Sequence, residues 1–216
     1  MRPFATDRRL LLALSTTALA CAQPGPARAP DTTATAQGAE APAPPGFTTA
    51  GTGSEHDFDY FAGAWTTRQH RLKARGVGST EWEDFPSTLC MSLYLDGGAT
   101  VDELWFPTKG WAGLTLRLFD REKRQWSIYW VSSKTGRLDP PVLGGFKGAH
   151  GEFFGKDVDD GRPVHVRYMW DKIDQDHARW QQAFFYDGKG WETNWTADFT
   201  RADPAAVCEH GRPKRQ

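Results

Sequence analysis

Four polar side chains that could do chemistry stand in the middle of runs typical of β-strands. Glu103, Arg117, Arg167 and Gln181 each have apolar neighbours in such a run. A charged or amide group inside a protein is costly unless it is paired, and paired polar groups in a cavity orient a ligand. We expect these residues to contribute to an interior binding site. Strand alternation alone leaves open the alternative that they face outward.

Tryptophan is the second candidate source of a binding site. All ten tryptophans lie between Trp65 and Trp195. Indole rings offer broad surfaces for an apolar or ring-bearing ligand, and they also fill the interiors of β-barrels. The six rings that fit either role are Trp82, Trp105, Trp130, Trp170, Trp180 and Trp195. Of these, Trp105, Trp130, Trp170 and Trp195 join the four polar residues as candidate ligand-binding positions.

Cofactor and metal signals are weak. His70 and His165 stand mid-strand, so haem held by one histidine is an alternative to our expectation of no cofactor. The sequence has no H-x-H, H-E-x-x-H or C-x-x-C pattern, and we therefore expect no metal site. No Ser-His-Asp pattern identifies a catalytic group, although such triads are defined by geometry. We assign no catalytic residue.

Short strands must position these side chains. Turn signals such as Asp96-Gly97-Gly98 separate runs with period-two alternation such as Leu114 to Leu118. One or two helical turns are expected from His56 to Ala62. About nine or ten local strands favour an all-β, antiparallel up-and-down barrel, because closure removes exposed edges. The expected strands, the second bent or bulged, are 64–74, 80–95, 99–106, 111–119, 125–133, 142–148, 150–156, 162–172, 177–186 and 192–201.

The N-terminus predicts export. Arg2, Arg8 and Arg9 precede an apolar stretch from Leu10 to Ala20, which is shorter than the roughly 20 residues of a spanning helix. We interpret 1–20 as a signal peptide. Cys21 follows a small residue, as in a bacterial lipobox. That motif prefers Leu three residues before the cysteine and a small residue next, whereas here Ala18 and Leu19 stand in the opposite order. We expect lipidation at Cys21, with ordinary secretion as the alternative.

The remaining chain divides by composition. Residues 21–54 are rich in Ala, Pro and Thr and predict a disordered tether. Residues 55–203 form the expected barrel domain, and 204–216 a flexible C-terminal tail. The expected location is the periplasm or the outer membrane through a lipid anchor, with secretion as the alternative. In an oxidising compartment Cys90 and Cys208 can form a disulfide that ties the tail to the barrel wall.

Charge excludes some partners. The formal net charge is -1, and cationic and anionic residues are interleaved without a basic stripe. We therefore expect no nucleic-acid partner, and a membrane partner only through a lipid anchor. The expected partner is a small apolar molecule. The sequence does not indicate an oligomeric state.

Several segments resemble a bacterial family of unknown function, the DUF1579-like group. The stretch Asp57 to Trp65 resembles the family's F-x-F-W-x-G-x-W start, except at Ala62-Gly63-Ala64. The resemblance spans residues 56–201 and implies a lipocalin or calycin-like barrel. It further implies that Trp65 lies across the barrel floor beneath Arg201, as a structural contact. It implies no catalytic residue. The other matching segments are 115–120, 126–130, 136–142 and 191–195.

Three functions are consistent with these observations. The leading hypothesis is an exported calycin-like protein that binds a small apolar ligand in its barrel. The first alternative is an enzyme, of isomerase or hydrolase type, that uses a polar cluster in the lumen. The second is a non-catalytic cell-envelope interaction module with a filled barrel.

Overall fold

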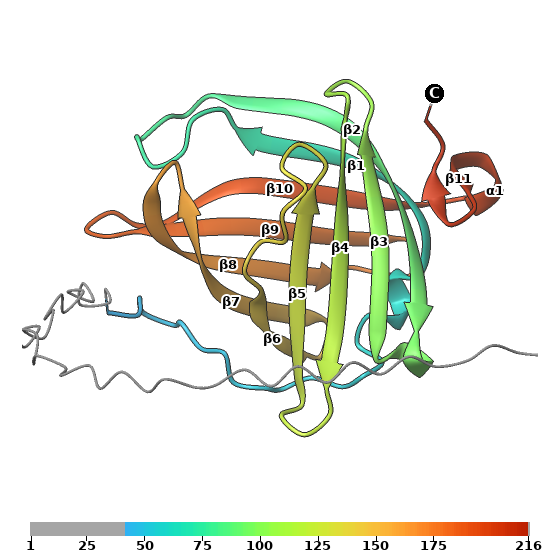
Figure 1. Ribbon diagram of the computed structural model, residues 1–216, viewed down its shortest axis with the longest axis horizontal. Helices are drawn as coiled ribbons and strands as arrows, with labels where there is room; N and C mark the ends of the chain where they lie inside the picture. Colours follow the sequence, from blue (N-terminus) through green and yellow to red (C-terminus); the bar gives the residue numbers. More distant parts are fainter. Residues whose placement is uncertain (1–41, 216) are drawn as a thin grey trace, which may run out of the picture. The chain divides into compact units, whose positions relative to one another are not determined.

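Ten antiparallel strands close into one barrel (Figure 1). The computed structural model describes residues 42–215. Each strand pairs with its neighbours along the chain, and β1 pairs with β10 to close the ring. The predicted all-β up-and-down barrel is confirmed. The strands are β1 (Gly63–Leu72), β2 (Trp82–Tyr94), β3 (Ala99–Phe106), β4 (Trp111–Asp120), β5 (Gln125–Ser132), β6 (Val142–Lys147), β7 (His150–Asp159), β8 (Arg162–Lys172), β9 (His177–Tyr186) and β10 (Gly190–Ala202).

Alternation along each strand separates core from surface. In β3 the side chains of Thr100, Asp102, Leu104 and Phe106 are buried, while those between them are partly exposed. Such alternation is expected of a sheet with one solvated face. β2 pairs without interruption with both neighbours, so it carries no β-bulge. The register shift lies in β10, between Thr193 and Trp195.

One end of the barrel is closed by a short helical turn. The predicted turn near His56 to Ala62 is a 3-10 helix, η1 (Asp59–Phe61). Phe61 and Trp65 are fully buried, and the Trp65 indole donates to the Phe61 carbonyl at 2.8 Å. The Arg201 guanidinium lies 4.1 Å from the Trp65 ring and donates to the Ala62 carbonyl at 2.9 Å. This end is a packed floor, as the resemblance implied.

Residues 42–54, expected in the tether, lie against the barrel. The Gly53 N–H donates to the Arg124 carbonyl at 3.0 Å, and the Trp126 indole donates to the Ser54 carbonyl at 3.0 Å. The Phe47 ring packs on Phe154 at 5.5 Å. Two hydrogen bonds and one ring contact therefore hold this segment on the barrel. The signal peptide 1–20, the lipidation position Cys21 and the tether up to residue 41 lie outside the described residues.

The C-terminal residues, expected as a flexible tail, also carry regular structure. A one-turn helix, α1 (Pro204–Val207), is capped by Asp203, whose carboxylate accepts from the Ala205 N–H at 2.9 Å. A hairpin of β11 (Cys208–Glu209) and β12 (Arg212–Pro213) follows. A disulfide joins Cys90 to Cys208, with 6.1 Å between the Cα atoms. The segment is therefore fixed to β2.

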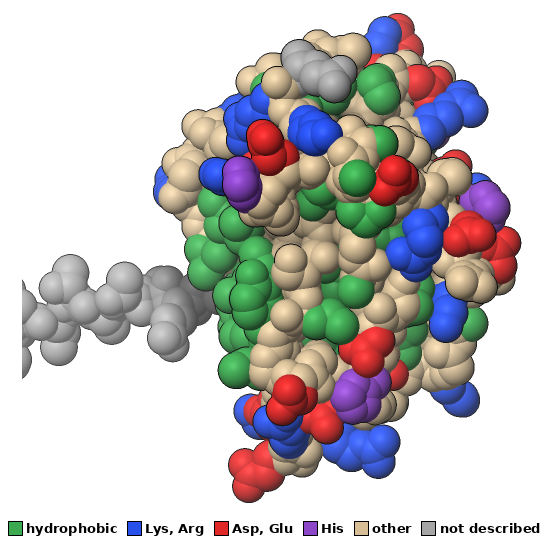
Figure 2. Space-filling view, turned by 90° about the vertical axis from the view of Figure 1, so that its right-hand side faces the viewer, with side chains coloured by type: hydrophobic (Ala, Val, Ile, Leu, Met, Phe, Trp, Pro, Cys, Tyr) green, Lys and Arg blue, Asp and Glu red, His purple; other side chains and the backbone are tan. Residues whose placement is uncertain are grey.

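The outer surface carries mixed charge. Figure 2 shows cationic and anionic side chains interspersed on the face it presents. Cross-strand pairs such as Arg179 with Asp198 (2.7 Å) account for part of this mixture. No single-sign patch dominates that face. Within residues 42–215, no helix is long and apolar enough to cross a membrane.

Candidate functional site

The barrel encloses a cavity of about 290 Å³. This volume is close to the lower end of the roughly 300–1,000 Å³ typical of small-molecule sites. The floor described above closes one end. At the opposite end, called the open end below, the lining includes Arg75 from the β1–β2 loop and the exposed Val158 near the end of β7. Eight aromatic side chains line it, together with aliphatic and polar residues: Phe106, Trp130, Tyr168, Trp170, Trp180, Phe184, Trp195 and Phe199.

The structure brings together half of the sequence-predicted ligand-binding residues. Arg117, Trp130, Trp170 and Trp195 line the cavity. The other four candidates, Glu103, Trp105, Arg167 and Gln181, are absent from its lining.

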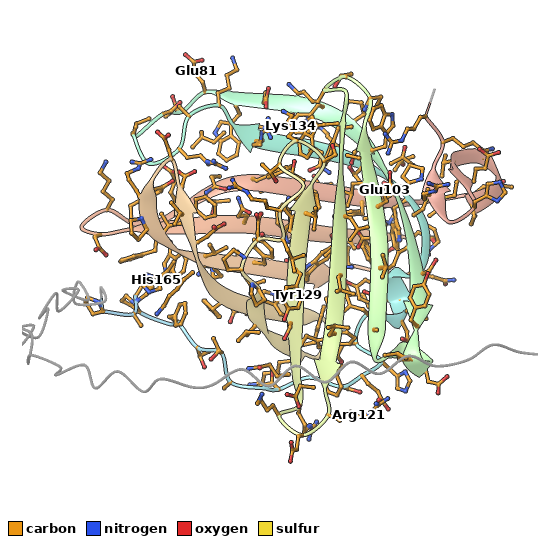
Figure 3. All side chains as sticks on the ribbon, in the orientation of Figure 1. Glu81, Glu103, Arg121, Tyr129, Lys134 and His165 are labelled. Carbon is orange, nitrogen blue, oxygen red and sulfur yellow. A yellow bond between two sulfur atoms is a disulfide. The ribbon has the colours of Figure 1, made fainter. Side chains whose placement is uncertain are left out.

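Glu103 and Trp105 lie on the outer face of β3. The Arg215 guanidinium donates to the Glu103 carboxylate at 2.6 Å and lies 4.7 Å from the Trp105 ring. In Figure 3, Glu103 lies on the side of β3 that carries the C-terminal segment. Their inward neighbours Asp102 and Leu104 take the core positions. These residues hold the C-terminus and do not form a lumen site.

Arg167 and Gln181 are also on the outer face. The Arg167 guanidinium stacks on the Trp191 ring at 4.9 Å. Its neighbours Val166 and Tyr168 take the inward positions of β8, and Tyr168 lines the cavity. In β9 the inward amide is Gln182, one residue after the predicted one. A phase error of one residue moves a side chain to the opposite face of the sheet.

Arg117 projects from β4 into the floor of the cavity. It is 2% exposed and donates to the carboxylate of Asp102, whose side chain is fully buried, and to Thr100 at 3.3 Å. Its guanidinium also lies over the Phe58 ring at 4.9 Å and the Trp170 ring at 5.4 Å. The Arg117 charge is therefore neutralised within the protein, since a buried cation needs such a partner.

A hydrogen-bond chain fixes the Trp195 ring. The Trp195 indole donates to the Gln69 amide oxygen at 2.7 Å. The Gln69 amide nitrogen donates to Thr67 at 2.7 Å and to Ser87 at 3.0 Å. Across the cavity wall, the Gln182 amide donates to Asn194 at 2.8 Å. Asn194 is the extra residue at the β10 register shift, which turns it and Trp195 toward the interior in succession.

A second buried carboxylate closes part of the open end. Asp159 accepts from Arg75 at 2.5 Å and from the Tyr186 hydroxyl at 2.6 Å, and Arg162 adds a third contact at 3.4 Å. Burial and the Asp159 carboxylate raise the pKa of Tyr186. The pair formed by Arg75 and Asp159 ties the β1–β2 loop to the β7–β8 turn.

Asp139 and Asp157 form a further polar feature of the cavity. The Asp139 N–H donates to the Trp130 carbonyl at 2.9 Å, which places this loop residue beside the cavity wall. Burial, and then the Asp157 carboxylate, raise the pKa of Asp139. Burial raises the pKa of Tyr168 as well, and both carboxylates add to that effect. The three groups are therefore electrostatically coupled.

Two glycines make room for this arrangement. A Cβ at Gly155 would stand 2.7 Å from the Pro141 carbonyl oxygen, so the loop that carries Asp139 can approach β7 only because Gly155 has none. A Cβ at Gly113 would stand 1.9 Å from the Trp130 ring. The absence of a Cβ at Gly113 therefore lets the Trp130 ring approach β4 closely. Neither requirement is visible in strand alternation.

Sequence reasoning missed several of these residues. Asp139 and Asp157 resembled ordinary turn residues, and the motif Asp139-Pro140-Pro141 was a turn signal only. Strand alternation could have identified Tyr168 and Gln182, because each alternates along its strand with residues that face outward. Trp180, considered as part of the aromatic set, does line the cavity.

The histidines considered for haem lie outside the cavity. His70 stacks on Trp82 at 4.3 Å and contacts the Asp84 carboxylate at 3.0 Å. His165 lies under the Phe47 ring at 5.1 Å, and Figure 3 labels it near the N-terminal segment. Burial lowers the pKa of His165. No histidine lines the cavity. Among the described residues no group of three His, Cys, Asp or Glu side chains could hold a metal ion.

Comparison with known proteins gives no family for this chain. No protein-family model matches the chain, which leaves the DUF1579-like resemblance without that support, and no curated protein matches it. The crystal structure of Rv2717c from M. tuberculosis is similar, with a TM-score of 0.46 and 11% identity over 68% of this chain and 98% of that one. The S-type phycobiliprotein lyase CPES from Guillardia theta matches with a TM-score of 0.46 and 11% identity over 70% and 94%. At this similarity neither carries an argument about ligand or activity. The chain is a closed, antiparallel, ten-stranded barrel with little helix.

Proposed function

We propose that the protein binds one small organic molecule inside its barrel. The observation that carries this proposal is the cavity of about 290 Å³, whose lining combines eight aromatic side chains with several polar groups. Apolar walls with a few convergent polar groups are the usual form of a small-molecule site. The Trp195 and Gln69 hydrogen bond supports a preformed wall, which lowers the ordering cost of binding.

The test is a direct search for an occupant. Purified full-length protein is analysed by native mass spectrometry, then denatured, and the released molecules are identified. Refolded protein is titrated with a panel of small aromatic and aliphatic compounds while tryptophan fluorescence is recorded. A copurified molecule or saturable quenching supports the proposal. If no molecule copurifies and no compound of the panel gives saturable quenching, the proposal is contradicted.

A cavity-filling variant makes the test specific. Ala197 lines the cavity and is 1% exposed, so Ala197→Leu should occupy space that a ligand needs. Thr200 lies on the same strand with an exposed side chain, so Thr200→Leu is the matched control. Ala197→Leu should weaken binding at least tenfold, while Thr200→Leu should leave it unchanged. Equal affinities in both variants contradict binding in the cavity.

The enzyme hypothesis is a second candidate because the lumen holds coupled ionisable groups. Asp139, with its raised pKa, could hold a proton beside Asp157 and Tyr168 as a general acid must. A screen of small esters and isomerisable carbonyl compounds, with Asp139→Asn as control, tests this role. Turnover that Asp139→Asn abolishes supports it.

We also propose that the protein is exported and lipidated at Cys21. The disulfide between Cys90 and Cys208 supports an oxidising compartment. The intact mass of the mature protein tests both parts. A chain that begins at Cys21 and carries acyl mass supports lipidation, and a Cys21→Ser variant should lose that mass. An unmodified mature chain contradicts lipidation, and a chain that retains residues 1–20 contradicts export.

A further inference from the structure

We propose that the ligand of this cavity is an organic cation, held between aromatic faces and the carboxylates of Asp139 and Asp157. This inference rests on the proposed function, because it names the chemical class of the molecule bound at the same site. It depends on three observations: the arrangement of the rings, the charges that remain after pairing, and the position of Asp139.

The rings form adjoining walls rather than a stack. Tyr168 and Trp180 have centroids 5.1 Å apart and planes inclined by 73°. Trp180 and Trp195 are 5.7 Å apart and inclined by 78°. These are edge-to-face contacts between rings that all line the cavity, and the face of an aromatic ring attracts the positive end of a ligand. Trp130 lines the same cavity.

The rings are held in place before a ligand arrives. Trp195 is fixed through Gln69, as described above, and Trp130 lies against Gly113. Aromatic cages that recognise quaternary ammonium groups use the same combination of several fixed ring faces.

The charges that line the cavity are unequally compensated. Its two cations, Arg117 and Arg75, are each paired with a carboxylate, Asp102 and Asp159 respectively. Asp139 and Asp157 also line the cavity, and Asp157 is a like-charge neighbour that opposes ionisation of Asp139. The Arg137 charge acts in the opposite direction, but it is the smallest of the three effects on the pKa of Asp139. A cation between the two carboxylates would relieve their repulsion.

Asp139 stands next to an aromatic wall. Its N–H donates to the backbone carbonyl of Trp130, which also lines the cavity. The site therefore combines two carboxylates with aromatic side chains in one cavity. An anionic ligand beside Asp139 and Asp157 would add to their repulsion, and a neutral apolar one would leave it unrelieved.

A set of near-isosteric compounds that differ in charge tests the inference. Choline, 3,3-dimethylbutan-1-ol and 3,3-dimethylbutanoate are titrated into the full-length protein, with tryptophan fluorescence and calorimetry as readouts. We expect choline to bind at least tenfold more tightly than the alcohol, which corresponds to about 1.4 kcal/mol. The carboxylate should bind most weakly. Equal binding of choline and the alcohol overturns the cation site and leaves ligand binding intact.

Variants assign the effect to the two carboxylates. Asp139→Asn and Asp157→Asn should each weaken choline binding about tenfold and leave binding of the alcohol unchanged. Asp198→Asn is the control, because Asp198 is exposed on the outer face, paired with Arg179. If Asp198→Asn weakens choline binding as much as Asp139→Asn and Asp157→Asn do, the effect is a long-range electrostatic one and the proposed site is wrong. Absence of binding by all three compounds also overturns the cation site; the proposed function fails only if the search for an occupant is negative too.

Discussion

The buried pair of Arg117 and Asp102 should be one of the strongest determinants of stability in this barrel. Arg117→Met keeps the aliphatic stem but removes the guanidinium. Asp102, with a fully buried side chain, is then left without its counter-charge. Removing one partner of a buried ion pair costs about 3–5 kcal/mol, because the other charge remains desolvated. The contacts with the Phe58 and Trp170 rings are lost as well.

The size of this effect can be isolated with a double-mutant cycle. Urea unfolding should give a free energy of unfolding about 3–5 kcal/mol lower for Arg117→Met. Arg117→Met combined with Asp102→Leu should recover most of that loss, because no unpaired charge remains. Arg179→Met is the matched control: its pair with Asp198 is about half exposed on both sides (50% and 52%), and the cost should be about 0–1 kcal/mol.

Two results would refute this reasoning. A loss below about 1 kcal/mol for Arg117→Met would mean that the pair is effectively solvated. A double variant as unstable as the sum of both single variants would mean that the two side chains act independently. Either outcome would also remove the argument that Arg117 is neutralised within the floor.

Three further predictions concern the tail, the floor and the open end. Cys208→Ser should lower the free energy of unfolding by about 2–4 kcal/mol, and reductant should do the same to the wild type but not to the variant; equal sensitivity to reductant in both would contradict a Cys90–Cys208 link. Arg201→Met should lower the free energy of unfolding by about 0.5–2 kcal/mol through the lost contact with Trp65, measured by urea unfolding; an unchanged free energy of unfolding would contradict the packed floor. Since folding raises the pKa of Asp139, its ionisation opposes folding; the penalty is absent below its unfolded value of 3.8 and develops as pH rises through the folded pKa. Asp139→Asn should therefore be more stable than the wild type at neutral pH and equal to it at pH 3, and an advantage that persists at pH 3 would contradict this sign.

Strand positions followed from local signals. The turn residues and period-two runs predicted strands that match β3, β8 and β9 at both ends. These signals are local because a turn needs particular residues at particular positions, and a half-buried strand needs alternation. The Trp65 and Arg201 contact came from the family resemblance, and the structure contains it.

The direction of each side chain was harder to predict. Arg117 and Arg167 looked equivalent in sequence, as mid-strand arginines among apolar neighbours, yet one is buried in the floor and the other stacks outside on Trp191. The outer face of this barrel also carries apolar and aromatic residues, so alternation did not identify the inner face. The prediction that Gln181 faces the cavity was wrong for the same reason.

The sequence by itself determined the secondary structure, the closed antiparallel sheet and the aromatic character of the interior. Only the tertiary structure decided which four of the eight candidate residues share a cavity. It also brought the β5–β6 loop residue Asp139 beside the β7 residue Asp157, across a contact that Gly155 permits. The physical reason is that strand formation depends on local alternation and turns, whereas a binding site depends on closure, register and close approach between distant segments.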